Sequence, residues 1–179
     1  RTIFGDAAAA TIIEKSREEG IFKFSLGTDG SGYQNLIVPN GALRNRFDMN
    51  AKEKDDGSGS IRTDNNLYMS GPEIFNFTIN AVPEVVSQVL KKNKIFLDDL
   101  NYVIFHQANK YMIEYLRKKI KIPKDKFYIN LLHTGNTVSA TIPIAIKDCL
   151  DNGIIKKSDK VLLVGFGVGY SWGGTIIKV

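Results

Sequence analysis

Cysteine and histidine are scarce in this sequence. One cysteine, Cys149, and two histidines occur among 179 residues. A single cysteine forms no internal disulfide, which favours a reducing, cytoplasmic environment. So few histidine and cysteine side chains cannot build a histidine-rich metal site or a cysteine-rich zinc centre. We therefore expect no bound metal.

Long hydrophobic runs are also missing. No apolar run reaches the roughly 18 residues that a membrane-spanning helix needs, and Arg1–Asp6 lacks the pattern of a secretory signal. We therefore expect no membrane partner. Apolar residues make up 43% and charged residues 24% of the chain, as is usual in globular proteins. This composition excludes collagen-like, disordered and coiled-coil classes, and the length is near that of one domain.

The net charge is +5, and its excess is concentrated between residues 91 and 126. Such a basic segment attracts anions, namely nucleic acid, a phosphorylated cofactor or an acidic protein. The ordinary alternative is a solvated helix face. Nucleic-acid readers usually add exposed aromatic residues on a strand or a recognisable module. Neither occurs here, so we expect no nucleic-acid partner.

Residue patterning predicts an α/β protein. Residues 9–13 and 21–26 have extended patterns and indicate a β-hairpin, and the polar residues 44–66 indicate a long surface loop. From residue 73, helical and strand patterns alternate, which favours a mixed, mostly parallel sheet with helices packed on it. The predicted strands are 102–105, 127–132, 161–164 and 172–179, with helices at 74–89, 112–120 and 139–150.

Three polar or glycine-rich segments follow the predicted strands: His106–Asn109, His133–Ser139 and Gly165–Gly169. Ligands of open α/β sheets collect at the carboxyl ends of the strands, so these segments predict one active site. Each also has an ordinary interpretation. His106 could be a satisfied core residue, Asn136 a helix cap, and the glycine run a tight turn with positive φ. The run lacks the spacing of a nucleotide-binding fingerprint.

Several segments together resemble the β-ketoacyl-acyl-carrier-protein synthase III family of the thiolase superfamily. They are Phe4–Ala10, Leu26–Gly30, Met69–Phe75, His106–Asn109, Gly135–Thr137 and Gly165–Gly173. The resemblance implies a thiolase-like fold: its C-terminal half plus the final hairpin of its N-terminal half. It divides the chain into closing strands of the first half at 1–43, a polar connection at 44–68 and the C-terminal half at 69–179.

The resemblance also implies a missing part. Members of the family are about twice as long, and their nucleophilic cysteine lies in the half that this sequence lacks. Cys149 does not take its place, because it falls inside a predicted helix, where we interpret it as a packing residue. We expect the chain to be part of a longer protein and to be inactive alone.

The family condenses an acyl-coenzyme A starter with malonyl carried on acyl carrier protein, in fatty acid biosynthesis, without a metal or redox cofactor. By resemblance, His106 and Asn136 are two members of its Cys-His-Asn triad. The resemblance further implies oxyanion and pocket roles for Phe166, Gly167 and Val168, coenzyme A or pantetheine contacts for Asn109 and Gly71, carrier docking at Lys118 and Lys119, and a homodimer for the full-length protein.

Other functions remain open from the sequence. One is a related acyltransferase or a condensing enzyme of secondary metabolism, although the presence of both His106 and Asn136 favours condensation. Another is a non-catalytic half that binds the carrier or pairs with a chain supplying the cysteine. The start at Arg1, without an initiating methionine, favours part of a longer protein over that second alternative.

Overall fold

A mixed five-stranded sheet forms the centre of the protein, described here by a computed structural model over residues 4–55, 57 and 59–179. Its order is β1-β9-β8-β6-β7. Strand β6 is parallel to β7 and β8, whereas the central strand β8 is antiparallel to β9, and β9 is antiparallel to β1. The strands are β1 (Ser25–Thr28), β6 (Tyr102–Phe105), β7 (Phe127–Tyr128), β8 (Lys160–Gly167) and β9 (Ser171–Lys178).

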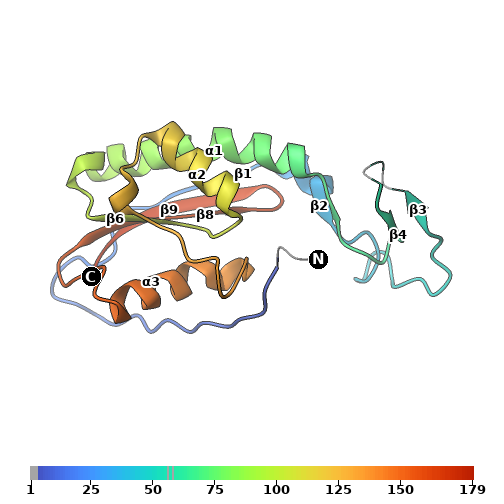
Figure 1. Cartoon of the computed structure of the whole chain (residues 1–179), viewed down its shortest axis with the longest axis horizontal. Coiled ribbons are helices and arrows are strands. Elements are labelled where there is room, and N and C mark those ends of the chain that lie inside the picture. Colours follow the sequence, from blue (N-terminus) through green and yellow to red (C-terminus); the bar gives the residue numbers. More distant parts are fainter. Residues whose placement is uncertain (1–3, 56, 58) are drawn as a thin grey trace.

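Helices cover both faces of this sheet (Figure 1). Helices α1 (Gly71–Asn93) and α2 (Lys110–Ile120) lie on one face, and α3 (Thr141–Asp151) lies on the other. In α1, the buried residues Val82, Val85, Val86 and Val89 recur at helical spacing and turn one apolar stripe toward the sheet. The α1–α2 side carries the larger apolar cluster, and the α3 side carries a smaller one around Ile104, Ala145 and Val161.

Short 3₁₀ helices connect the larger elements. They are η1 (Gly30–Asn35), η2 (Leu97–Asp99), η3 (Lys124–Lys126) and η4 (Val138–Ala140). The last of these leads directly into α3.

The N-terminal segment differs from the predicted hairpin. Residues 9–13 form no strand, and Ile21 and β1 pair instead with β9. The segment runs beneath α3 in Figure 1, and Ala8–Ile12 border a pocket whose other side includes residues of that helix. The free edge of β9 therefore takes the strand pairing that the sequence pattern assigned to a local hairpin.

Residues 36–69 extend from the sheet as an arm (Figure 1). At its base, β2 (Leu36–Ile37) pairs with β5 (Tyr68–Met69), and farther out β3 (Lys54–Asp55) pairs with β4 (Ile61–Arg62). The predicted long loop at 44–66 thus contains a short hairpin.

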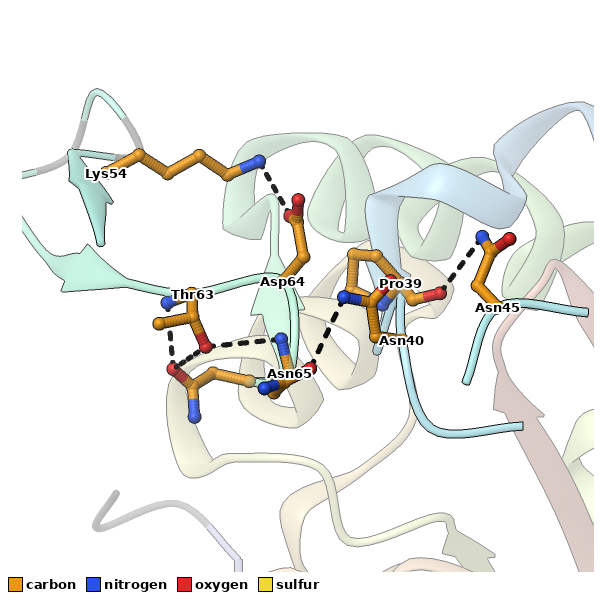
Figure 2. A network of polar contacts seen from close by, with 8 residues as sticks. Pro39, Asn40, Asn45, Lys54, Thr63, Asp64 and Asn65 are labelled. Carbon is orange, nitrogen blue, oxygen red and sulfur yellow. Dashed lines mark hydrogen bonds and ion pairs between the residues drawn. The ribbon is translucent and has the colours of Figure 1, made fainter. Parts of the chain in front are cut away.

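Polar contacts connect distant parts of this arm (Figure 2). Lys54 forms a 2.6 Å ion pair with Asp64, and Asn40 Nδ2 donates to Asn65 Oδ1 at 3.3 Å. Asn45 Nδ2 donates to the Pro39 carbonyl at 3.4 Å. Polar side chains within and next to the predicted loop therefore supply contacts within the arm.

Two strands differ in length from their predicted spans. The strand predicted at 127–132 ends at Tyr128 in β7, and β8 continues beyond Val164 through Gly167. The second difference matters for the site, because Phe166 then lies on a paired strand opposite Trp172.

Candidate active-site cleft

A cleft of about 660 Å³ lies at the carboxyl edge of the parallel strands. Its walls come from the start of α1, the segment after β6, the η4–α3 junction and the end of β8. Most of the lining is apolar, with a few polar groups, as in typical ligand-binding sites. Seven of the residues predicted for the site line it: His106, Asn136, Phe166, Gly167, Val168, Asn109 and Gly71. Lys118 and Lys119 do not line it; they lie in the last turn of α2.

His106 is held at the end of β6. Its backbone N–H donates to the Val164 carbonyl of β8 at 2.8 Å, which continues the sheet pairing by one residue. The Nδ1 atom lies 2.7 Å from Thr141 Oγ1, and the ring meets Phe166 edge-on, with centroids 5.4 Å apart. Burial lowers the pKa of His106 to about 4 because the charged form loses solvation. The imidazole is therefore neutral at pH 7.

This pKa predicts a pH-dependent stability. The unfolded chain binds a proton at His106 below pH 6.5, whereas the folded chain does so only below about 4. The contribution of His106 is therefore fully present above pH 6.5 and falls as the pH drops from 6.5 to 4, by at most about 3 kcal/mol. Urea unfolding across this range should show a steeper loss of stability for wild type than for His106→Gln. His133→Gln, at an exposed position, should match wild type; equal slopes for wild type and His106→Gln would contradict the prediction.

Asn136 presents an amide to the same cleft. Its side chain is 7% exposed, and its Oδ1 accepts a hydrogen bond from the Val138 N–H at 2.8 Å. Within the described part of the chain, no group accepts a hydrogen bond from its Nδ2. The side chain does not cap α3, whose N-cap is Ala140. Instead the local Asx turn fixes the orientation of the amide and leaves its N–H groups available.

The glycine run ends strand β8 at Gly167 and enters the short turn to β9 at Val168 and Gly169. A turn is present at residues 168–170, but Gly165, Gly167 and Gly169 all lack positive φ, so the expectation that the run needs positive φ is wrong. A Cβ at Gly167 would meet no heavy atom within 4 Å. The end of β8 brings Phe166 against His106, and Val168, in the turn that follows and 43% exposed, lies in the cleft wall.

Gly71 and Asn109 lie at two helix starts that face the cleft. A Cβ on Gly71, the first residue of α1, would meet no heavy atom within 4 Å, so protein packing does not require glycine there. Asn109 is the N-cap of α2, and its Oδ1 accepts from the Met112 N–H at 2.9 Å. Its Oδ1 therefore stabilises the helix, and a ligand contact would use its Nδ2.

Two polar residues, one that supports the site and one that lines it, were missed by the sequence reasoning. Gln107 is fully buried; its Oε1 accepts from the Asn130 N–H at 2.8 Å, and its Nε2 donates to the Phe105 carbonyl at 2.7 Å. Gln107 therefore connects the end of β6 to the chain after β7. Its position directly after a buried strand was a signal in the sequence that could have identified it. Thr141, the partner of His106, had no such signal because it lies 35 residues farther along the chain.

Cys149 cannot serve as the nucleophile of this cleft. It is fully buried in α3 and does not line the cleft, as expected for a packing residue. Burial, with the nearby Asp148 carboxylate, raises the pKa of its thiol to about 12. Among the described residues, no three acidic, histidine or cysteine side chains gather as a metal site would require. In that same part of the chain, no helix has the length and apolar character needed to cross a membrane.

The mixed sheet with helices on both faces and a cleft at its carboxyl edge defines a thiolase-like α/β protein. A crystal structure of a 3-oxoacyl-(acyl-carrier-protein) synthase III superimposes with a TM-score of 0.89 at 40% identity, covering 94% of this chain and 50% of that one. The corresponding synthase from Burkholderia xenovorans gives 0.80 at 37% identity, covering 93% and 46%.

The sequence comparisons identify the family. The family model described as 3-oxoacyl-[acyl-carrier-protein (ACP)] synthase III C terminal matches residues 90–179. The beta-ketoacyl-[acyl-carrier-protein] synthase III of Clostridium tetani is 40% identical over 98% of this chain and 52% of its own length. The chain therefore belongs to the 3-oxoacyl-acyl-carrier-protein synthase III family, and it spans about half the length of the curated relatives it matches.

Proposed function

We propose that this chain is the C-terminal part of a 3-oxoacyl-acyl-carrier-protein synthase III of fatty acid biosynthesis. The enzyme would condense an acyl-coenzyme A starter with malonyl carried on acyl carrier protein. The observation that carries the proposal is the presence of two neutral hydrogen-bonding groups, His106 and Asn136, in one apolar cleft.

The two groups suit decarboxylation of a malonyl thioester. When the carbon–carbon bond to the carboxylate breaks, carbon dioxide leaves. The electron pair of that bond stays on the α carbon and forms an enolate, with negative charge on the thioester oxygen. An imidazole N–H and the free Asn136 N–H would both donate to that oxygen, and stabilisation of this kind is often the largest catalytic contribution. A neutral imidazole keeps its donor at every pH at which the enzyme would work, because its pKa is about 4.

The acyl-transfer step needs a nucleophile from outside this sequence. A cysteine thiolate would attack the acyl-coenzyme A carbonyl, release coenzyme A and hold the acyl group as a thioester. The enolate carbon would then attack that thioester and displace the cysteine. In this scheme Phe166 and the backbone at Gly167 and Val168 form the pocket wall, and Gly71 and Asn109 border the pantetheine arm.

A reconstitution assay tests this function. Full-length protein, acyl-coenzyme A and malonyl-acyl carrier protein should yield 3-oxoacyl carrier protein, free coenzyme A and carbon dioxide in equal amounts. Mass spectrometry should also find the acyl group on a cysteine other than Cys149. Carrier binding without either product would identify a non-catalytic carrier-binding protein and would overturn the proposal.

Carrier docking on α2 yields a separate prediction. Lys118 is exposed, whereas Lys119 Nζ already donates to the Ile79 carbonyl of α1 at 2.7 Å. We therefore assign the larger share of docking to Lys118. Lys118→Glu should weaken binding of the acidic carrier about three- to tenfold at low salt and much less at high salt, since surface charges are screened.

Surface plasmon resonance at two salt concentrations measures this effect. Lys157→Glu is the matched control, because Lys157 is exposed but precedes β8, at the opposite edge of the sheet from the cleft. Equal weakening by both variants would indicate a general charge effect and would contradict docking on α2.

A further inference from the structure

The loop that carries Asn136 lies outside the strands and helices, between the end of β7 and the start of η4. Within this loop, the Gly135 N–H donates to the Leu131 carbonyl at 3.1 Å, and Asn136 Oδ1 accepts from the Val138 N–H at 2.8 Å. These local hydrogen bonds shape the turn. They do not determine where the turn lies relative to the catalytic edge of the sheet.

A backbone contact from the N-terminal segment reaches this loop. The Gly5 N–H donates to the Asn136 carbonyl at 2.9 Å, and Phe4 forms an isolated parallel bridge with Asn136. Phe4 and Asn136 both line the cleft. The segment from the far end of the chain therefore meets the loop at the residue whose amide the proposed reaction uses.

The close approach at position 5 requires glycine. A Cβ at Gly5 would lie 1.9 Å from the Thr134 carbonyl oxygen and 3.1 Å from the carbonyl carbon. Both atoms belong to the backbone, so no side-chain rotation relieves the clash. Thr134 and Asn136 belong to the same loop, so a shift that separates Gly5 from Thr134 also disturbs the hydrogen bond from Gly5 to Asn136.

We propose that Gly5 is a positioning residue, whose backbone contact with the loop at 134–136 sets the place of the Asn136 amide in the cleft. This inference rests on the proposed function and deepens it, because the amide must point at the enolate oxygen to stabilise it. The hydrogen bond from the Val138 N–H orients the amide within the loop, and Gly5 fixes the loop within the fold.

Gly5→Ala in the full-length protein should lower the rate of malonyl decarboxylation by about 10- to 100-fold, since a displacement of about 1 Å can have an effect of this size. Transfer of the acyl group from coenzyme A to cysteine does not use the Asn136 amide and should fall much less. Equal loss of both half-reactions would contradict a role that acts through Asn136.

Gly20→Ala is the matched control. Gly20 also adjoins an isolated bridge of the N-terminal segment, formed by Ile21 and Ile177. A Cβ at Gly20 would meet no atom nearer than the Lys178 carbonyl oxygen at 3.9 Å, and Lys178 ends β9, whose first residues line the cleft. Both half-reactions should therefore proceed at the wild-type rate. A comparable loss in Gly20→Ala would mean that any change in the N-terminal segment lowers decarboxylation, and it would overturn the specific role of Gly5.

A double-mutant cycle tests whether Gly5 acts through Asn136. In the Asn136→Ala background the amide is already absent, so Gly5→Ala should lower decarboxylation by less than about threefold further. If Gly5 only supported the fold, the two losses would multiply. Multiplication of the losses would overturn the positioning role.

Hydrogen exchange in wild type tests the contact without any variant. The Gly5 N–H should exchange at least about 100-fold more slowly than in an unstructured peptide, because it donates to the Asn136 carbonyl. Exchange at the rate of an unstructured peptide would overturn the proposal even if Gly5→Ala failed to fold. If wild type itself failed to decarboxylate malonyl carrier protein, the proposed function would fail, whereas slow exchange at Gly5 would still establish the contact.

Discussion

Asn136→Ala in the full-length protein should lower the rate of malonyl decarboxylation by about 10²- to 10³-fold. Removal of one donor from an oxyanion site typically has an effect of this size. The effect should be large here because Asn136 is only 7% exposed and the hydrogen bond from the Val138 N–H fixes the orientation of its amide.

The same substitution should affect the two half-reactions differently. Transfer of the acyl group from coenzyme A to cysteine does not form the malonyl enolate, so part of this transfer should survive in Asn136→Ala. His106→Ala should show the same division. Release of labelled carbon dioxide from malonyl carrier protein measures one step, and labelling of the protein by acyl-coenzyme A measures the other. Equal loss of both steps would be incompatible with the assigned roles.

Asn152→Ala provides the matched control. This substitution also removes an amide side chain. Asn152, however, follows α3 at the end away from the cleft, where its Nδ2 donates to Asp148. We expect decarboxylation at the wild-type rate in this variant. A comparable loss in Asn152→Ala would mean that destabilisation of α3, rather than a missing donor, explains the effect at Asn136.

The fold of the part from residue 73 onward, where helices and strands alternate, was predictable because the hydrophobic pattern of each segment matches the helix or strand that it forms. The α1 valines recur at helical spacing, and β6 is a short apolar run that ends at the first polar site residue. Parallel strands bring their carboxyl ends to one edge, so the joining of His106 and Phe166 in one cleft followed from topology. The family resemblance added Asn136 through the segment Gly135–Thr137.

The rest depended on contacts between distant residues. Residues 9–13 and 21–26 have strand patterns that suit a local hairpin, but Ile21 and β1 pair with β9 instead, and β1 becomes an edge strand of the main sheet. Local patterning cannot decide between a near and a distant strand partner. Likewise, Thr141 meets His106 only because α3 packs against β6, although the two residues lie 35 positions apart in the sequence.

Gly32→Ala is expected to destabilise the protein strongly. A Cβ at Gly32 would lie 2.0 Å from a ring carbon of Tyr170, and real Cβ atoms do not approach other atoms so closely. The ring cannot easily move, because it stacks on Phe77 with centroids 4.1 Å apart and its hydroxyl accepts a hydrogen bond from Asn35. Relief requires backbone shifts, which commonly cost about 1–3 kcal/mol in overpacked sites. We expect the upper end of this range, about 3 kcal/mol.

Gly30→Ala in the same 3₁₀ helix is the control for Gly32→Ala. A Cβ at Gly30 would meet no heavy atom within 4 Å, so the free energy of unfolding should stay near that of wild type. Urea unfolding of the three proteins measures the difference.

Because Tyr170 directly follows the segment that carries Phe166 and Val168, displacement of its ring should also disturb the cleft wall and lower decarboxylation. Equal stabilities for Gly32→Ala and Gly30→Ala would mean that Tyr170 can move away, and then the cleft wall should be equally tolerant.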